Sequence, residues 1–414
     1  MPPSPLRVAA DHILSTNGST RGTAYSMSNK LVRLGDQLFA GWLDSGGICM
    51  IRSLDLNTGA LSDPFALGQT EVKDNHCGPA IVATSDGHLH AIVGSHNRPF
   101  RYRKTLRPAD ITGWTDEPAF APDSTYPSLA VGPDDTLHLV GRAWLPPGRS
   151  ESCKLVYQKR KGDSDWSDPI AVCKTPSPTG YVHYGGNILC DPAGTLHLTF
   201  HMYHGDPPES PIQGYLRSDD EGETWIHSDG TKVDLPAITD TCEVFAKNED
   251  EIFRGGQSIA RDVQGRLYVL VTGDHGTNLI CRLNGPGDWQ VIELGPHIDR
   301  FFPGRRSPQE GNITFGRDGM LYVCLDMNDP EAQWGDPCVE VLLLASSDCG
   351  ETFTGLPITQ PDPTVPHWLS NMERSSGLAP IGGPPAILYT AGFKGEGCAP
   401  NEKTEIHLVI LQEC

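Results

Sequence analysis

The sequence predicts an all-β fold, namely one domain over residues 1–414 that forms a seven-bladed β-propeller. Three observations lead to this prediction. A short apolar strand with a turn dipeptide before it recurs seven times, a second strand-like segment follows each copy, and two segments match Asp-box turns. The sequence shows neither helical periodicity nor a break in composition, so a single domain is the simplest interpretation.

The recurring strand is the strongest of the three signals. Its copies read GDQLFAGWLD, DGHLHAIVGSH, DDTLHLVGRAW, AGTLHLTFHMY, QGRLYVLVTGD, DGMLYVCLDMN and GPPAILYTAGF. The Asp and Gly residues before the strands supply the positive φ that a tight hairpin turn needs. We therefore expect equivalent strand positions for Leu38, Leu89, Leu137, Leu196, Leu267, Leu321 and Ile387.

A further strand-like segment follows each copy: ICMIRSLDL, FRYRKT, KLVYQKR, GYLRSDD, NLICRLN, VLLLASSD and EIHLVIL. Seven such units separated by variable loops describe blades around an axis. The last segment is expected to pair with N-terminal strands between Tyr25 and Leu34 and so to close the ring. A pair of β-sandwiches, the alternative all-β arrangement, does not require seven equivalent units.

Two turns carry the Asp-box pattern S-x-D-x-G-x-T-W. Ser218 to Trp225 (SDDEGETW) matches it fully, and Ser346 to Phe353 (SSDCGETF) nearly does. In such a turn the Asp side chain accepts hydrogen bonds from backbone amides, and the aromatic residue packs between strands. We predict a structural role for both turns.

Charge and composition exclude several classes of protein. The net charge of -20 and the pI near 5.1 argue against a nucleic-acid partner, because the surface would repel phosphates. No apolar run approaches the roughly 18 residues that span a bilayer, and MPPSPLRVAADH lacks the regions of a signal peptide. We expect a soluble, monomeric protein without a membrane partner or a secretion signal of its own.

The cysteine pattern favours free thiols over a disulfide framework. Twelve cysteines are few for 414 residues, and none forms the CxxC pair of a zinc or thioredoxin site. Cys190, Cys281 and Cys324 fall inside predicted strands, where a free cysteine usually acts as a small buried apolar residue.

Polar residues recur at equivalent places in two neighbouring units. The first strand of a blade lines the central channel, so residues before it and at the end of the second strand should converge on the axis. His76 and His96 hold these places in the second unit, and Tyr126 and Arg142 hold them in the third. We predict that these four side chains face one cavity.

Other titratable residues receive lesser roles. The fourth unit and the start of the segment after His96 contribute expected substrate-binding residues, namely His183, Tyr184, His201 and Arg98. Four further strand histidines are interpreted as surface or edge residues without a catalytic role: His88, His90, His138 and His197.

The combination of two imidazoles, a phenol and a guanidinium suits β-elimination from a uronate. The arginine, helped by a histidine, would bind and neutralise the carboxylate, which makes the proton at C5 more acidic. A neutral imidazole or a phenolate can remove that proton, while the other group protonates the leaving oxygen at C4. Such a reaction needs no metal ion or other cofactor.

At these residues the sequence resembles the propeller polysaccharide lyases with BNR (Asp-box) repeats. That family includes ulvan lyases and the rhamnose-glucuronate lyases that act on arabinogalactan of the gum arabic type. The resemblance rests on NHCGPAI, DGHLHAIVGSHNRPFRYRKTLRPADITGW, STYPSLAV and LVGRAW, roughly residues 74–145. The 20-residue step from His76 to His96 and the 16-residue step from Tyr126 to Arg142 are similar to the family pattern.

The resemblance implies a role for each residue. His76 and Tyr126 would form the acid and base pair, His96 and Arg142 would hold the carboxylate, and Tyr184 would bind substrate. Members of the family can carry a structural calcium or zinc ion, but no ligand spacing in this sequence assigns one.

The resemblance also implies a substrate. Both lyase groups cut the bond between L-rhamnose and O4 of D-glucuronate, and the net charge of -20 favours sparsely charged arabinogalactan over sulfated ulvan. We therefore expect an enzyme that removes rhamnose caps, a substrate class that suggests a secreted or periplasmic location. The alternatives are an endo-acting ulvan lyase, a glycoside hydrolase of rhamnosidase or sialidase type, and a non-catalytic carbohydrate-binding propeller.

Overall fold

Strands account for nearly all the secondary structure of the chain. The computed structural model describes residues 6–144, 153–175, 181–182, 186–204, 209–247, 258–308, 311–374, 381, 383–400 and 402–414. In these residues there are 29 strands and a single short helix, α1 (Gly295–Ile298). No helix in the described part is long and apolar enough to span a membrane. The prediction of an all-β fold is confirmed.

The strands of the described residues form six sheets. One sheet has the order β2 (Leu31–Leu34), β3 (Gln37–Leu43), β4 (Ile48–Asp55), β5 (Phe65–Gln69). An eight-stranded sheet contains β6 (Gly78–Ala83), β7 (Leu89–Gly94), β8 (Arg98–Arg107), β9 (Asp110–Trp114), β10 (Phe120–Val131), β11 (Leu137–Ala143), β12 (Lys154–Arg160) and β13 (Ile170–Lys174). A five-stranded sheet contains β14 (Tyr181–Val182), β15 (Asn187–Cys190), β16 (Leu196–His204), β17 (Glu209–Ser218) and β18 (Glu243–Lys247).

The remaining three sheets have four strands each. The first contains β19 (Ile259–Arg261), β20 (Leu267–Thr272), β21 (Asn278–Gly285) and β22 (Asp288–Glu293). The second contains β23 (Gly311–Phe315), β24 (Leu321–Met327), β25 (Glu340–Ser346) and β26 (Thr354–Pro357). The third has the order β1 (Leu6–Gly18), β29 (Thr404–Glu413), β28 (Ile387–Ala391), β27 (His367–Met372).

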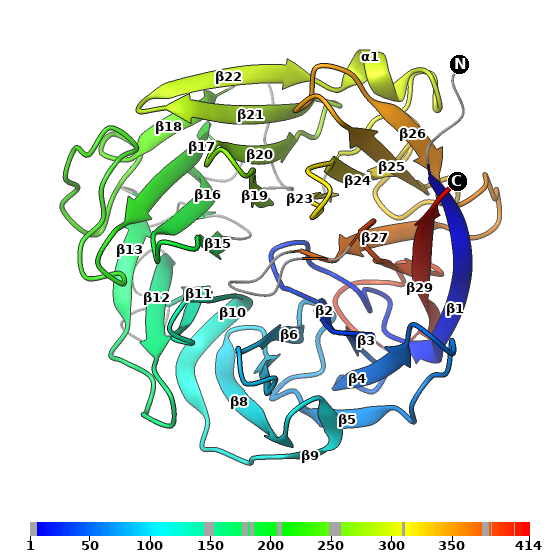
Figure 1. Ribbon diagram of the computed structural model, residues 1–414, viewed down its shortest axis with the longest axis horizontal. Coiled ribbons are helices and arrows are strands. Elements are labelled where there is room, and N and C mark those ends of the chain that lie inside the picture. Colours follow the sequence, from blue (N-terminus) through cyan, green and yellow to red (C-terminus); the bar gives the residue numbers. More distant parts are fainter. Residues whose placement is uncertain are drawn as a thin grey trace.

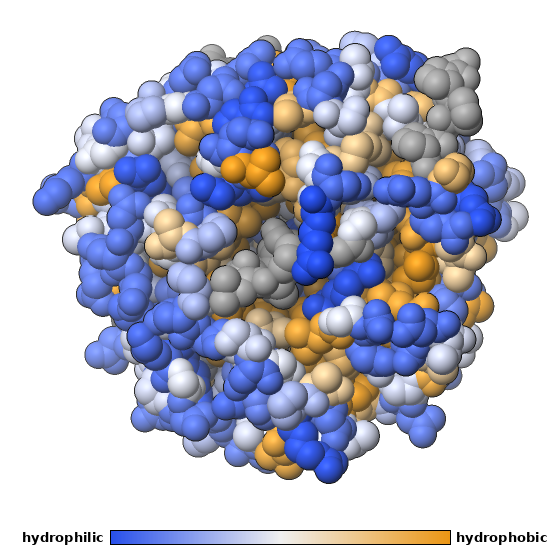
Figure 2. Space-filling view, viewed as in Figure 1, coloured by the Kyte–Doolittle hydropathy of each residue, from blue (hydrophilic) through white to orange (hydrophobic). Residues whose placement is uncertain are grey.

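The sheets lie around a common centre in chain order (Figure 1). Strands β2, β6, β10, β15, β19, β23 and β27 lie nearest that centre, and each sheet extends outward from them. The viewed face is mainly hydrophilic at its rim, and apolar residues show further inward (Figure 2). Buried apolar side chains of neighbouring sheets pack against one another and form clusters that combine residues of consecutive units.

The predicted strand repeat is confirmed residue by residue. Six of the seven expected residues begin a strand, and Leu38 is the second residue of β3, after Gln37. All seven are at most 3% exposed, as core positions of equivalent strands should be: Leu38, Leu89, Leu137, Leu196, Leu267, Leu321 and Ile387.

The predicted pairing of the chain ends is wrong in one respect. The last strand, β29, pairs with β1 in antiparallel register from Leu6 with Glu413 to Gly18 with Thr404, and not with the segment from Tyr25 to Leu34. That segment instead leads into β2, which pairs with β3. The 13 residues of β1 can extend along all 10 residues of β29, whereas β2 has only four residues. The side chains of β1 also alternate between more buried and more exposed positions, as expected for a strand with one face against the protein. Both ends of the chain thus join one sheet.

Both Asp boxes have the predicted geometry. Asp220 Oδ1 accepts a hydrogen bond from the backbone N of Thr224 at 2.9 Å, and Ser218 Oγ accepts one from Gly222 N at 2.8 Å. The same bonds recur in the second box around Asp348. The aromatic residues Trp225 and Phe353 are buried, so the boxes hold the sheets together.

Three strand histidines are core residues, which corrects their interpretation as surface or edge residues. Nδ1 of each lies 2.6 to 2.8 Å from the hydroxyl of a tyrosine on the next strand, in the pairs His90–Tyr102, His138–Tyr157 and His197–Tyr215. Each ring also stacks on its tyrosine. The imidazole can be buried because its polar atom is paired. His88 remains partly exposed.

These buried histidines predict that acid destabilises the fold. Burial lowers the pKa of His138 from 6.5 to about 4. The unfolded chain therefore binds a proton more readily, so the contribution to stability is complete above pH 6.5 and is lost as the pH falls toward 4. We expect His138 to account for about 2–3 kcal/mol of lost unfolding free energy over that window.

Urea unfolding at several pH values measures this effect. The substitution His138→Asn should flatten the pH dependence by that amount, and His88→Asn, at a partly exposed position, serves as the control for the loss of a strand histidine. An unchanged pH dependence in the His138 variant would contradict the assignment.

Candidate functional site

Two of the predicted catalytic histidines share one carboxylate. Asp74, just before β6, accepts from Nδ1 of His76 at 2.6 Å through Oδ1 and from Nδ1 of His96 at 2.7 Å through Oδ2. The backbone N of His76 also donates to Oδ1, at 2.8 Å, which fixes the carboxylate. The two imidazole centroids are 4.6 Å apart. Because Nδ1 of His76 donates to Asp74, its neutral ring keeps a lone pair at Nε2.

The charges of this group follow from its surroundings. Burial opposes ionisation of Asp74, but the hydrogen bonds from His76 and His96 outweigh it and hold the pKa of this carboxyl well below its usual range. Burial lowers the pKa of His76, and Arg21 and His96 lower it further, against the effect of Asp74. Asp74 is thus an anion and His76 a neutral imidazole at neutral pH.

Tyr126 and Arg142 come from the neighbouring strands β10 and β11. A bulge in β10 between Thr125 and Ser128 interrupts the pairing, and within it Tyr126 has a φ of +59°. A bulky residue in this region costs on the order of 1–3 kcal/mol, and such strain is common where a side chain must be aimed. The ring centroid lies 6.2 Å from that of His76, and the Arg142 guanidinium carbon lies 4.9 Å from the Tyr126 ring centroid.

The structure therefore brings the four residues of the sequence prediction into one cluster. His76 and Tyr126 are close enough for one sugar ring to contact both. Arg142 and Tyr126 are each only 2% exposed, and the Arg142 guanidinium packs against the Tyr126 ring.

Two further residues belong to the cluster and were missed by sequence reasoning. Arg21 Nη1 donates to the Tyr25 hydroxyl at 2.5 Å and lies 3.1 Å from His76 Nε2. The Tyr25 ring stacks on His76 at 5.8 Å and meets Tyr126 edge-on at 5.0 Å. The Arg21 guanidinium also lies 4.5 Å over the ring of Trp334. A usable signal was present, because RGTAY precedes the inner strand of its unit, as His76 precedes β6.

The predicted substrate-binding residues are less closely associated with the cluster. Arg98 is exposed at the start of β8 and donates from Nη1 to the carbonyl oxygen of Asn97 at 2.8 Å. His201 is 1% exposed and stacks on Tyr203. His183 and Tyr184 lie outside the described residues.

One group near the site has the composition of a metal centre. Asp74, His76 and Cys398 each offer a ligand atom, all within 4.8 Å of one another. Both ring nitrogens of His76 are already engaged, and burial together with Asp74 raises the pKa of the Cys398 thiol. The adjacent Arg21 guanidinium further opposes a cation. These residues therefore do not fit a calcium or zinc ion.

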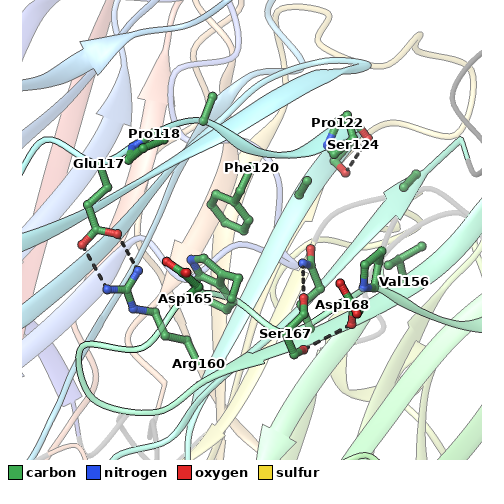
Figure 3. A pocket seen from close by; sticks show the side chains of 16 residues that line it. Glu117, Pro118, Phe120, Pro122, Ser124, Val156, Arg160, Asp165, Ser167 and Asp168 are labelled. Atoms are coloured by element: carbon green, nitrogen blue, oxygen red, sulfur yellow. Dashed lines mark hydrogen bonds and ion pairs between the residues drawn. The ribbon is translucent and has the colours of Figure 1, made fainter.

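A separate cavity of about 340 Å³ lies between β10, β12 and the segment 165–169 (Figure 3). Its wall combines the stacked rings of Phe120 and Trp166 with the ion pair of Arg160 and Glu117. Neither His76 nor Arg142 lines it. Because Glu117 already neutralises the Arg160 guanidinium, this cavity is a weaker candidate for the binding of an anionic substrate.

Comparison with known proteins adds a family. The model of the BNR repeat-containing family matches residues 37–295. The chain belongs to this family. The matched range contains four clustered residues of the predicted site and the first Asp box, whereas Arg21 and Tyr25 precede it. A search of curated protein sequences finds no match.

Several solved structures share the fold of this BNR repeat-containing chain. An ulvan lyase from a family of polysaccharide lyases is 14% identical, with 97% of each chain covered and a TM-score of 0.72. The polysaccharide lyase Uly1 is 14% identical, with 97% of this chain and 99% of that one covered and a TM-score of 0.65. An α-L-arabinofuranosidase from Fusarium graminearum is 12% identical, with coverages of 80% and 92% and a TM-score of 0.51. At these identities the likeness concerns the fold alone.

Proposed function

We propose that this protein is a polysaccharide lyase that cleaves the bond to O4 of a uronate by β-elimination. The observation that carries the proposal is the cluster in which one carboxylate orients His76 and His96 beside two phenols and two guanidinium groups. Hydrolysis of a glycosidic bond usually employs a pair of carboxyl groups on either side of it. In the described cluster the one carboxyl group, that of Asp74, is fully engaged by the histidines.

The scaffold that we propose is a seven-bladed propeller. The eight-stranded sheet divides into β6 to β9 and β10 to β13, which are joined only where β10 pairs with β8. If these halves are separate blades, the six sheets supply seven units of at least four strands, in agreement with the seven sequence repeats.

The geometry suggests which residue performs each step. Nε2 of the neutral His76 removes the proton from C5, and the electrons of that C–H bond form the C4–C5 double bond. The C4–O4 bond then breaks, and the Tyr126 hydroxyl protonates the departing oxygen. Arg142 supplies the positive charge that stabilises the carboxylate during proton removal, and His96 helps to hold that carboxylate. The cycle closes when the proton on His76 returns to the Tyr126 phenolate, so no cofactor takes part.

For the substrate we propose a glycan in which L-rhamnose is linked to O4 of D-glucuronate, as in rhamnose-capped arabinogalactan. The net charge of -20 opposes a densely sulfated polymer. Arginines further along β8 do not offset it, because Arg101 pairs with Glu71 and Arg103 pairs with Asp116.

One assay tests the proposal against its alternatives. The protein is incubated with gum arabic and, separately, with ulvan, and both ultraviolet absorbance and free rhamnose are followed. Absorbance that rises together with rhamnose release from gum arabic supports the proposal, because only elimination conjugates a new double bond to the carboxylate. Rhamnose release without absorbance would indicate a hydrolase, and unsaturated products from ulvan alone would indicate an ulvan lyase.

The pH dependence of the rate should reflect the neutral state of His76. Its pKa lies below the ordinary value of 6.5, so kcat/KM should stay constant down to about pH 6.5 and fall only at lower pH. A rate profile from pH 4 to 8 measures the acidic limb. A midpoint above 6.5 would contradict the assignment of His76 as the base.

A further inference from the structure

The guanidinium that faces the cluster from the N-terminal side belongs to Arg21. Its segment, residues 19–30, connects β1 with β2 and carries Tyr25 as well. Arg21 is partly exposed, and one nitrogen, Nη1, bonds the Tyr25 hydroxyl and contacts His76 Nε2. Its Nε is buried without a hydrogen-bond partner. The Arg21 side chain thus contacts the proposed base and has an N–H group that could still donate a hydrogen bond.

Arg142 is placed differently. It is 2% exposed and packs against the ring of Tyr126, which is itself 2% exposed, whereas Arg21 is partly exposed. A sugar carboxylate that reached the cluster would meet Arg21 before it met Arg142. The planar fork of a guanidinium can bind both oxygens of a carboxylate, and the bond is stronger for being charge-assisted.

We propose that Arg21 receives the carboxylate of the uronate, and that this contact draws its guanidinium away from Nε2 of His76. The inference rests on the proposed lyase function and adds a residue to it. In the structure the lone pair that His76 needs for proton removal faces Arg21 Nη1 at 3.1 Å. Substrate binding would release that lone pair only when a carboxylate is in place. Arg142 then acts through the field of its charge, from its place against the Tyr126 ring.

The electrostatics of the cluster agree with this sequence of events. The groups that face His76 are Asp74, Arg21, His96 and the phenols of Tyr25 and Tyr126. Cys398 lies beside them. Arg21 is one of the groups that lower the basicity of His76. A bound carboxylate would neutralise Arg21, so His76 should become a stronger base when substrate arrives.

Binding of small sugars tests the proposal without turnover. Calorimetry compares methyl β-D-glucuronide with the neutral methyl β-D-glucoside. We expect the substitution Arg21→Met to weaken glucuronide binding at least tenfold and to leave glucoside binding unchanged, while Arg21→Lys should lose part of the affinity. The control Arg107→Met removes an equal charge from an exposed ion pair with Asp110 and should change either affinity less than twofold.

A second measurement follows the imidazole of His76 by NMR in a pH titration. Glucuronide should raise the pKa of His76 in the wild-type protein. In Arg21→Met the pKa of His76 should already be raised without ligand, and glucuronide should not raise it further. Thermal unfolding of each variant confirms that it folds, and Arg21→Lys replaces Arg21→Met if the latter does not.

The outcomes separate this inference from the function on which it rests. Glucuronide affinity that survives in Arg21→Met but is lost in Arg142→Met would overturn the role of Arg21 and leave the lyase proposal standing. A wild-type protein that neither binds glucuronide nor forms an unsaturated product would overturn both.

Discussion

Replacement of His76 by alanine should lower kcat about 10²–10⁴-fold while the protein stays folded, because a positioned general base contributes an effect of that size. The removed ring takes with it the Nε2 lone pair and one of the two side-chain hydrogen bonds that orient Asp74, while the bond from the backbone N of residue 76 can remain. His96 would keep its own bond to that carboxylate, so the second imidazole should remain in place. Formation of the unsaturated uronate in single-turnover conditions measures the loss directly.

The matched control for this substitution is His88→Ala. His88 is also a partly exposed histidine, and it bonds a backbone carbonyl at Thr105 well away from Asp74. Its removal should leave the rate within about twofold of the wild type. If His76→Ala retained a tenth of the rate or more, His76 would not be the base, and the phenol of Tyr25 or Tyr126 would take that place.

The repeat made most of this fold accessible from sequence. A turn dipeptide followed by alternating apolar residues indicates where a strand begins and which of its side chains point into the core. Leu89 and Leu321 could therefore be placed without a structure. The pairing of the chain ends was less accessible. Strand β1 begins outside the repeat, and only the structure shows that this 13-residue strand pairs with β29. Buried His90 illustrates the same limit, since its burial depends on a tyrosine of the next strand.

The site was predictable where it coincided with the repeat. His76 lies two residues before Gly78, where β6 begins, and Tyr126 lies two residues before Ser128, where β10 resumes its pairing with β11, so the two residues hold equivalent places in neighbouring units. Arg21 and Tyr25 come from the first unit, where an extended loop replaces the regular spacing. Asp74 was not identified because its role depends on two histidines separated by 20 residues in sequence. Such contacts follow from the tertiary arrangement of loops rather than from any local pattern.

Replacement of Tyr126 by phenylalanine should distinguish the role of the hydroxyl from that of the aromatic ring. The phenyl ring can keep its place in the bulge, its edge contact with Tyr25 and its position over Arg142. The backbone cost of φ +59° is unchanged because both residues have a β-carbon of the same kind. Only the proton donor to the leaving oxygen is lost, so kcat should fall about 10²–10⁴-fold while KM changes little.

The nature of the leaving group makes this prediction specific. A substrate whose oxygen at C4 leaves readily without a proton, such as a phenolic ether at C4, should recover much of the rate in Tyr126→Phe but not in His76→Ala, because proton removal from C5 still needs its base. Tyr389→Phe, which removes a hydroxyl bonded to Asp11 at the chain ends, is the control and should leave both substrates unaffected. Equal loss on both substrates in Tyr126→Phe would instead mean that Tyr126 acts on the C5 proton, with the roles of the phenol and the imidazole exchanged.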